Sequence, residues 1–287
     1  MREIRSRIKS VKSTQQITKA MKMVSVAKLR RVQKGTEGMK LFSGQCREIL
    51  GYLLSGHTDH PLLTPRQEVK RVVYVLFVGN RGLCGNYNTA LVRYMQELLE
   101  KTDISASVTV VGRWGRDVLA SAGLPIRETF SEPGDLPVME DAVALAEHLK
   151  KLYLDGEADE VYLVYQRYVS ALHQEPVSTR LLPAAPPHEI PSGELTYLFE
   201  PSKEAVLDSA VQLFVNSEVF STLQEARAGE QAARMTAMTA ATDATEELIG
   251  RLDLDLNRAR QAAITTEISE IVGGANALKN RDGQSSQ

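Results

Sequence analysis

The sequence contains little cysteine and no long apolar run. Its two cysteines, Cys46 and Cys84, cannot build a multi-disulfide scaffold or a zinc site made of cysteine alone. No stretch reaches the 18 uninterrupted apolar residues that indicate a membrane-spanning helix. The segment Met1–Arg5 also lacks the apolar core of a secretory signal. We therefore expect a cytosolic protein with reduced thiols.

The chain also lacks an excess of charge of either sign. It has 34 basic and 36 acidic residues, a net charge of −2, which argues against a general nucleic-acid binder. With 43% hydrophobic and 24% charged residues, the composition excludes disordered and fibrous proteins. The length of 287 residues fits one large or two small domains.

Proline is absent from both ends of the chain. All eleven prolines lie between Pro61 and Pro201. Because proline breaks helices, this distribution predicts two helical arms around a turn-rich middle. We expect the N-terminal helix of a coiled coil at 1–60 and an α/β globular domain at 61–201. The C-terminal helix, with a short disordered tail, is expected at 202–287.

The two arms carry opposite charge. Eleven basic residues and one acid between Arg2 and Lys34 give a local net charge of +10, whereas Glu230–Leu278 carries −4. The charges are either solvated helix faces, or part of the basic arm faces an acidic partner. Exposed pairs between the arms would each be worth only about 0–1 kcal/mol.

The C-terminal arm shows the 3–4 apolar spacing of a left-handed coiled coil. The spacing occurs in two successive series: Ile249, Leu252, Leu256, Ala259 and Ala263, then Ile264, Ile268, Ile271, Ala275 and Leu278. The pair Gly273-Gly274 predicts the end of this helix.

The N-terminal arm has a less regular seam, which begins at Ile4, Ile8 and Val11 and continues with polar Gln15 and Thr18. Neither arm can bury its stripe alone, so we expect an antiparallel pair of helices. The longer C-terminal helix should extend beyond the shorter one. Its exposed apolar tip then requires an apolar socket on a partner, or self-association.

The middle of the chain alternates between strand and helix patterns. The segments in question are strands at Val72–Val78, Ser107–Val111 and Glu160–Tyr168, and helices at Asn86–Lys101, Trp114–Ala122 and Asp141–Leu154. Such alternation predicts a Rossmann-like, mostly parallel sheet. The proline-rich stretch Pro183–Pro191 is expected to be a surface connector.

A glycine-rich loop, Gly79–Gly85, follows the first predicted strand. Its spacing G-x-x-G-x-x-G matches neither the dinucleotide motif nor the phosphate loop G-x-x-x-x-G-K-[ST]. A tight turn with close helix–sheet packing is the favoured interpretation, and Cys84 is then a packed residue. The five histidines show no metal-ligand spacing, and no catalytic constellation is recognisable. We expect no catalytic residue, cofactor or metal.

Three groups of segments nevertheless resemble one family closely. They are Ile4–Ile8 with Thr14–Val24, the loop Arg81–Gly85, and Glu230–Met238 continued by Ala241–Ala244 and Arg258–Thr265. In these segments the chain is similar to the gamma subunit of F-type ATP synthase. Because they lie at its start, middle and end, the resemblance covers nearly the whole chain.

The resemblance implies a non-catalytic central rotor. One copy would turn inside a hexamer of three α and three β subunits, with the α/β domain on the membrane c-ring beside the epsilon subunit. Nucleotide sites would belong to the β subunits, and proton flow would supply the torque. The chain would bind no nucleic acid and would not insert into the membrane. It would lie peripherally at the cytoplasmic face of a bacterial cell membrane.

The resemblance also assigns contacts with the β subunits to particular residues. They are Met21 and Lys22 at a neck, and Arg234, Arg260, Gln261, Thr265, Glu267 and Glu270 on the C-terminal helix. Two residues depart from the family pattern: Asn80 replaces a common Asp, and Lys22 replaces the Glu of some members. The tail at 279–287 exceeds the usual family end.

Two other classes of function remain as alternatives. A Rossmann-like nucleotide enzyme would use the loop Gly79–Gly85 and bind a dinucleotide. A coiled-coil adaptor would use its basic arm to bind nucleic acid with steep salt dependence.

Overall fold

The computed structural model describes residues 1–54, 60–121, 123–131, 133–134, 136–185 and 199–284. It divides into two compact units. Unit 1 comprises Met1–Met21 with Met238–Gln287, and unit 2 comprises Lys22–Ala237. The boundaries of these units differ from the predicted domain boundaries at 60 and 202. The predicted division into domains stays a prediction. Most of the expected connector Pro183–Pro191 lies outside the described residues.

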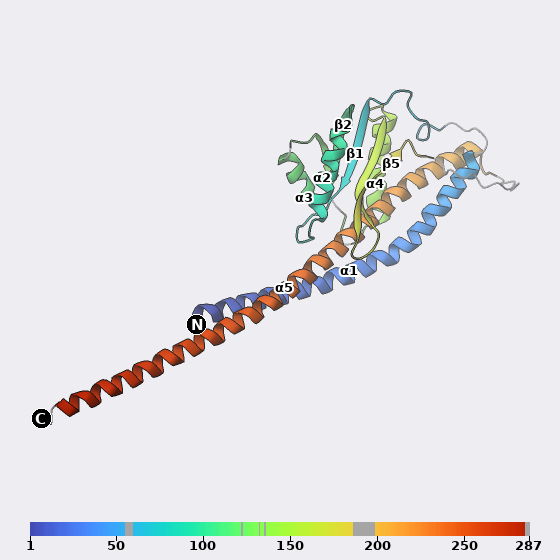
Figure 1. Ribbon diagram of the computed structural model, residues 1–287. Coiled ribbons are helices and arrows are strands. Elements are labelled where there is room, and N and C mark those ends of the chain that lie inside the picture. Colours follow the sequence, from blue (N-terminus) through green and yellow to red (C-terminus); the bar gives the residue numbers. More distant parts are fainter. Residues whose placement is uncertain (55–59, 122, 132, 135, 186–198, 285–287) are drawn as a thin grey trace. The chain divides into compact units, whose positions relative to one another are not determined.

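Long helices occupy both proline-free ends of the chain. Helix α1 spans Arg2–Leu54 and helix α5 spans Lys203–Gln284 (Figure 1). The predicted stop at Gly273-Gly274 is wrong, because α5 runs through both glycines and covers part of the expected disordered tail. Glycine in a helix interior costs only about 1 kcal/mol relative to alanine, which weakens a helix without ending it. Among the described residues, no helix has the length and apolarity needed to cross a lipid bilayer.

Unit 2 contains a five-stranded sheet with the order β3-β2-β1-β4-β5. The strands are β1 (Arg71–Phe77), β2 (Ser105–Val111), β3 (Ile126–Phe130), β4 (Glu160–Tyr168) and β5 (Gln174–Leu182). The first four strands of this order are parallel, and β5 is antiparallel to β4. The predicted Rossmann-like, mostly parallel sheet is confirmed.

Strands β3 and β5 were absent from the prediction, and both lie at sheet edges. Strand β3 has only five residues, and two of them, Ile126 and Phe130, are apolar. Strand β5 contains Pro176, which lowers the strand signal but is tolerated in an edge strand. The apolar-run criterion therefore found only the strands with long buried runs.

Apolar side chains cover both faces of the sheet. On one face, α2 (Tyr87–Glu100) and α3 (Arg113–Ser121) enclose a core that includes Leu91 and Leu119. On the other face lie α4 (Met139–Leu154), the last turns of α1 and the first turns of α5. In unit 2 the two long helices are thus part of the sheet domain's core.

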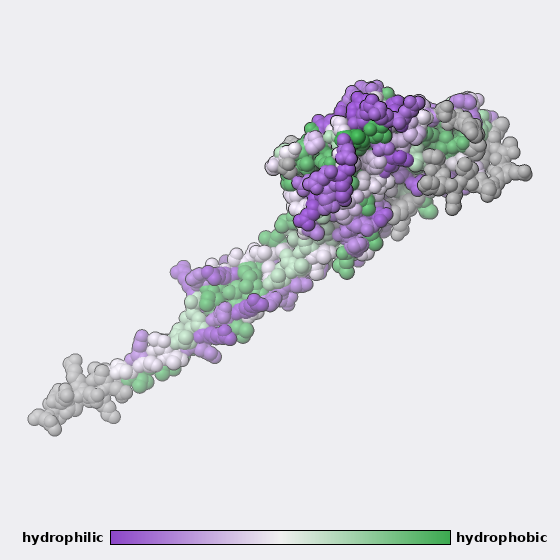
Figure 2. Space-filling view, turned by 45° about the horizontal axis from the view of Figure 1, so that its top comes forward, coloured by the Kyte–Doolittle hydropathy of each residue, from purple (hydrophilic) through white to green (hydrophobic). Residues whose placement is uncertain are grey.

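In unit 1 the two helices form the predicted coil. Of the first 20 residues, Ile8 and Thr18 are buried, and Ile4, Val11 and Gln15 are half-buried, as their spacing predicts. Their counterparts on α5 are half-buried too: Ile249, Leu252, Leu256 and Ala259. The Thr242 hydroxyl bonds the Thr18 hydroxyl at 2.9 Å across the coil. Figure 2 shows apolar side chains remaining on the surface of this coil among polar ones.

The far end of α5 lacks such a seam. Every residue from Arg260 to Gly274 is exposed, including Ala263, which was predicted to be buried. Three isoleucines of the second predicted series, Ile264, Ile268 and Ile271, are 48%, 55% and 65% exposed. The side chains of Ala275 and Leu278 lie outside the described residues. The expected apolar tip is therefore present within unit 1.

Candidate functional site

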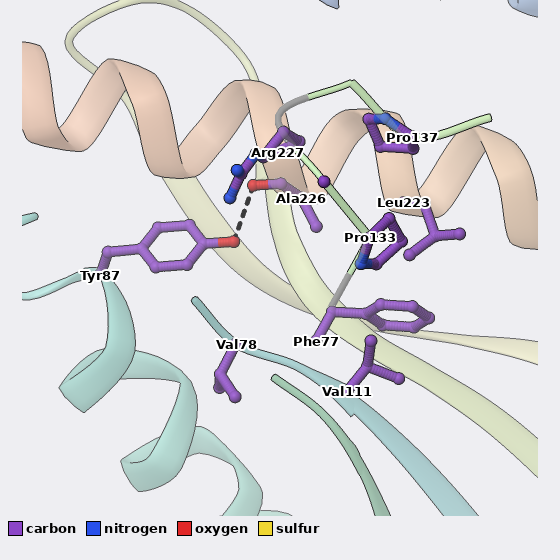
Figure 3. A pocket seen from close by; sticks show the side chains of 10 residues that line it. Phe77, Val78, Tyr87, Val111, Pro133, Pro137, Leu223, Ala226 and Arg227 are labelled. Atoms are coloured by element: carbon purple, nitrogen blue, oxygen red, sulfur yellow. Dashed lines mark hydrogen bonds between the residues drawn. The ribbon is translucent and has the colours of Figure 1, made fainter. Parts of the chain in front are cut away.

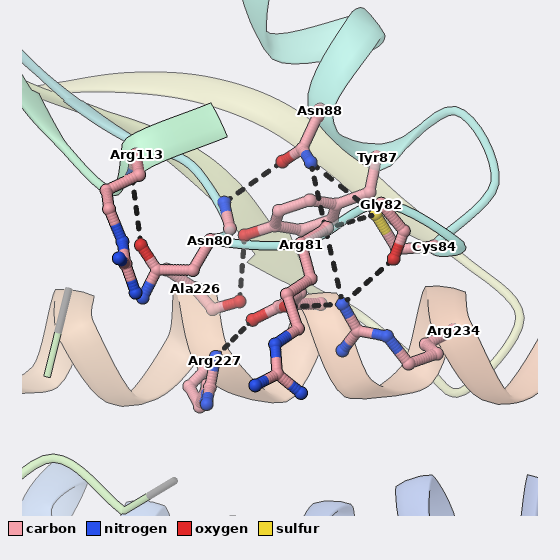
Figure 4. A network of polar contacts seen from close by, with 12 residues as sticks. Asn80, Arg81, Gly82, Cys84, Tyr87, Asn88, Arg113, Ala226, Arg227 and Arg234 are labelled. Carbon is pink, nitrogen blue, oxygen red and sulfur yellow. Dashed lines mark hydrogen bonds and ion pairs between the residues drawn. The ribbon is translucent and has the colours of Figure 1, made fainter. Parts of the chain in front are cut away.

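The glycine loop after β1 lies against helix α5 within unit 2 (Figure 4). Glu230 is at the centre of this junction and is only 2% exposed. Its carboxylate bonds Arg227 Nη1 and Arg234 Nη2, both at 2.5 Å. The three residues share one face of α5 because they are three and four positions apart. A buried carboxylate is thus paired on both oxygens, as burial of a charge requires.

Gly79 lies next to this carboxylate. A Cβ atom at Gly79 would lie 3.0 Å from Glu230 Oε1 and 3.1 Å from its carboxyl carbon. The Gly79 N–H donates to Asn88 Oδ1 at 3.0 Å, and Arg234 Nη2 donates to the Gly82 carbonyl at 3.4 Å. The favoured interpretation of the glycines as close-packing residues fits this geometry.

The same contacts argue against a phosphate site at the loop. In sheets of this type, phosphates bind beyond the carboxyl ends of the strands, on free backbone N–H groups. Here the Gly79 N–H is already bonded to Asn88, and the carboxylate of Glu230 occupies the adjacent space. An anionic phosphate placed there would meet a carboxylate of the same charge.

Further hydrogen bonds surround this junction and connect α5 to α2, and α2 to the sheet. The Tyr87 hydroxyl donates to the Ala226 carbonyl at 2.8 Å, and Gln166 Nε2 donates to the Tyr87 carbonyl at 3.3 Å. Asn80 Oδ1 accepts from the Arg113 N–H at 2.9 Å. An uncharged amide oxygen can accept this bond. Asn80, which replaces the common Asp of the family, therefore has a structural role.

A pocket of about 300 Å³, part of it open to solvent, adjoins the junction (Figure 3). Phe77, Val78 and Val111 line it from the strand ends, and Leu223 and Ala226 from α5. Two of its lining residues carry polar side-chain groups: Tyr87, whose hydroxyl bonds Ala226, and Arg227, which pairs with Glu230. Neither is positioned as an acid, base or nucleophile.

The cysteines fit a structural role. Burial raises the pKa of Cys84, and the nearby Glu230 carboxylate adds to the shift while Arg234 opposes it. Burial also raises the pKa of Cys46. Both thiols stay protonated and unreactive at neutral pH. Among the described residues, no three His, Cys, Asp or Glu side chains come together as metal ligands.

Met21 and Lys22, the predicted neck contacts, are both half-buried. Met21 closes the first segment of unit 1, and Lys22 opens unit 2. The next two residues, Met23 and Val24, are 65% and 51% exposed. Apolar side chains therefore face solvent next to the predicted neck.

The remaining predicted contacts fall into two groups. Five lie on the exposed end of α5: Arg260, Gln261, Thr265, Glu267 and Glu270. The Thr265 hydroxyl donates back to the Gln261 carbonyl at 2.9 Å, so these two share one face of the helix. Arg234 lies apart from them, in unit 2, where its side chain is 11% exposed and bonds Glu230.

The sequence analysis did not assign Glu230 and Asn88 to the site. The pattern Arg227-x-x-Glu230-x-x-x-Arg234 places two cations on the same helical face as one acid, and it could have indicated a paired carboxylate. No comparable signal identifies Asn88, because its amide meets Gly79 only through the tertiary fold.

Comparison with known proteins places the whole chain in context. A protein-family profile described as ATP synthase matches residues 1–278. The ATP synthase gamma chain of Desulfitobacterium hafniense is 45% identical over 97% of this chain and 99% of its own length. The ATP synthase gamma chain of Desulforamulus reducens is 46% identical with the same coverage.

Solved structures share the fold. A chain of the Euglena gracilis mitochondrial ATP synthase rotor superposes with a TM-score of 0.68 at 21% identity, covering 92% of this chain and 98% of its own. A chain of the Tetrahymena thermophila mitochondrial ATP synthase central stalk and c-ring structure gives 0.60 at 24% identity, covering 78% and 99%. A sheet domain carried on two long terminal helices is thus common to these chains.

Proposed function

Since the chain belongs to the ATP synthase gamma chain family, we propose that it is the central rotor of a proton-translocating ATP synthase. One copy turns inside a hexamer of three α and three β subunits. The sheet domain contacts the epsilon subunit and the membrane c-ring. Like its family, the chain is a non-catalytic subunit. The observation that carries this proposal is identity above 40% over nearly the full length of gamma chains.

The two-helix construction suits a shaft. In unit 1, the seam around Ile8 and Leu252 joins α1 to α5, so a twisting force is shared by two helices. In unit 2, the same helices are embedded in the core of the sheet domain. Each unit thus resists torsion through packing instead of through one helix alone.

The Glu230 junction has a mechanical role in this proposal. Arg234 of α5 donates to the carbonyls of Arg81 and Gly82 in the glycine loop, at 3.5 and 3.4 Å, and Glu230 of the same helix holds Arg234 through a buried ion pair. The family resemblance also makes Arg234 a contact of the β subunits, and within this chain its side chain is 11% exposed and pairs with Glu230.

The other proposed contacts with the β subunits are likewise those that the family resemblance assigns. Met21 and Lys22 form the neck contact, and exposed side chains of α5 form the second: Arg260, Gln261, Thr265, Glu267 and Glu270. The apolar side chains of Ile264, Ile268 and Ile271 would enter an apolar sleeve of the hexamer, since exposed aliphatic groups favour burial. No cofactor or metal is required for this role.

The energy source of the rotor lies outside this chain. One elementary charge that crosses 100 mV releases about 2.3 kcal/mol, so several protons must contribute to each ATP. As a peripheral subunit of the ATP synthase, the chain would be found at the cytoplasmic face of a bacterial cell membrane.

The neck provides the sharpest test of the proposal. Met21→Lys adds a cation to a half-buried position, and it should reduce the number of protons pumped per ATP hydrolysed. Inverted membrane vesicles that contain the assembled complex allow both rates to be measured together. Leu41→Lys is the control, since it adds the same charge to α1 at a side chain that is 74% exposed.

An unchanged ratio of protons to ATP in Met21→Lys would remove this residue from the contact set. If the ratio of protons to ATP fell equally in Met21→Lys and Leu41→Lys, any added positive charge on α1 would weaken coupling, whatever its position.

A further inference from the structure

Helix α4 carries a buried lysine, Lys150, to which the proposed rotor function assigns no role. Lys150 is 2% exposed, whereas Lys151, the next residue on the same helix, is exposed. An ammonium group removed from water is strongly destabilising unless hydrogen bonds replace its hydration. An ammonium has three N–H donors, and all of them need acceptors.

Three side chains supply these acceptors. Lys150 Nζ donates to Glu147 Oε1 at 2.6 Å, to Asn216 Oδ1 at 3.4 Å and, at close range, to Gln212 Oε1. Glu147 belongs to α4 itself and is 61% exposed. The two amides belong to α5 and lie four residues apart, on neighbouring turns of one face. The ammonium therefore bridges α4 to two consecutive turns of α5.

Apolar contacts surround this bridge. Leu149 and Tyr153 of α4 are fully buried in the same core as Val211 and Val215 of α5. The hydrophobic effect is non-directional, so apolar contacts select one rotation and one axial position of the two helices less strictly than hydrogen bonds do. A buried polar group that must keep its hydrogen bonds does select one register, as polar core residues do in coiled coils.

From this geometry we infer that Lys150 is a positioning residue that fixes the register of α5 against α4. The inference has a mechanical consequence that rests on the proposed rotor function. Torque that enters the sheet domain reaches α5 partly through this bridge. The bridge prevents α5 from rotating about its axis within the surrounding apolar core. Two further contacts hold α5 at other points along its length: Ser43 of α1 donates to Glu218, and Glu230 meets the glycine loop.

The test replaces the whole bridge by apolar side chains in the full-length chain. The variant Lys150→Met/Gln212→Leu/Asn216→Ala leaves no buried polar member unpaired, and such replacements commonly preserve or raise stability. Lys151→Met is the matched control, because it removes the same charge from the next, exposed position. Single Lys150→Met serves as a second variant.

Nitroxide labels at Leu154→Cys on α4 and Leu213→Cys on α5 report the register. These side chains are 50% and 43% exposed, while the native Cys46 and Cys84 are buried. Pulsed electron paramagnetic resonance should give one narrow distance distribution in the labelled parent and in Lys151→Met. In the triple variant, the single narrow peak should be lost. A narrow, unshifted peak in a folded triple or single variant would overturn the inference.

Coupling in the assembled complex tests the consequence for torque. The triple variant should pump fewer protons per ATP hydrolysed, and Lys151→Met should match the parent. Loss of the narrow peak with unchanged coupling would overturn the torque-bearing role. If the parent chain failed to assemble with α and β subunits, the proposed function would fall, but the distance measurement on the isolated chain would still decide the register role.

Discussion

At the residue scale, single atoms decide how the sheet meets α5. Gly79 is adjacent to a buried carboxylate, and the space for a Cβ atom is already filled at 3.0 Å. Glu230 cannot move away freely, because Arg227 and Arg234 hold both of its oxygens. The absence of a side chain at Gly79 is therefore a requirement of the junction.

Gly79→Ala should destabilise the chain by about 1–3 kcal/mol, the usual cost of overpacking. The added methyl group has to displace the Glu230 carboxylate, which strains its two ion pairs. Urea unfolding of the purified chain measures the loss. Gly82→Ala is the control, since no atom lies within 4 Å of its Cβ position. Equal stability of the two variants would show that the contact at Gly79 is loose.

Asp159 fixes the start of β1. Its Oδ2 accepts from the backbone N–H groups of Lys70 and Arg71, both at 2.9 Å. Burial by itself raises the pKa of Asp159, but the two backbone bonds and the Arg71 charge outweigh burial and leave the pKa below its ordinary value. The folded state thus stabilises the ionised carboxylate of Asp159 relative to the unfolded chain.

Because the folded pKa is lowered, the stabilisation by Asp159 is present above its unfolded pKa and is lost as the pH falls through the folded pKa. Asp159→Ala should cost about 1–3 kcal/mol at pH 7, since two backbone donors lose a charged acceptor. The difference in unfolding free energy from the parent should shrink in acid. A difference that does not change between pH 7 and pH 2 would contradict this role.

At the element scale, apolar periodicity predicted the structure best where burial is continuous. The bounds of β4 and the extent of α1 follow directly from their patterns. The edge strands β3 and β5 were missed, because an edge strand is half solvated and needs no apolar run. The junction was only partly predictable: glycines signal close packing, whereas the identity of the partner helix depends on tertiary contacts.

The two ends of unit 1 should respond differently to substitution. Ile8 is 8% exposed in the coil, and Ile268 is 55% exposed on the tip. Ile8→Ala should raise amide hydrogen exchange across Met1–Met21, since lost packing costs about 2–5 kcal/mol at a buried site. Ile268→Ala should leave exchange in this segment unchanged, as a surface substitution. Similar exchange in both variants would contradict the observed seam.

At the scale of the whole molecule, membership of the gamma chain family gives one explanation for features that composition alone could not explain. The proline-free ends form the two long helices, and the glycine loop packs against one of them. The site could be predicted only through the family resemblance, because contacts with other subunits leave no catalytic motif in the sequence. Proposed contact residues such as Gln261 are ordinary exposed helix residues until a partner covers them.

The central claim is that one copy of this chain works inside a larger ring. Native mass spectrometry of the complex purified through a tag on this chain measures the claim directly. The account predicts one copy of the chain for every three α and three β subunits, in a complex that hydrolyses ATP while the isolated chain does not. Recovery of the chain alone, or as a self-associated dimer without α and β subunits, would contradict it.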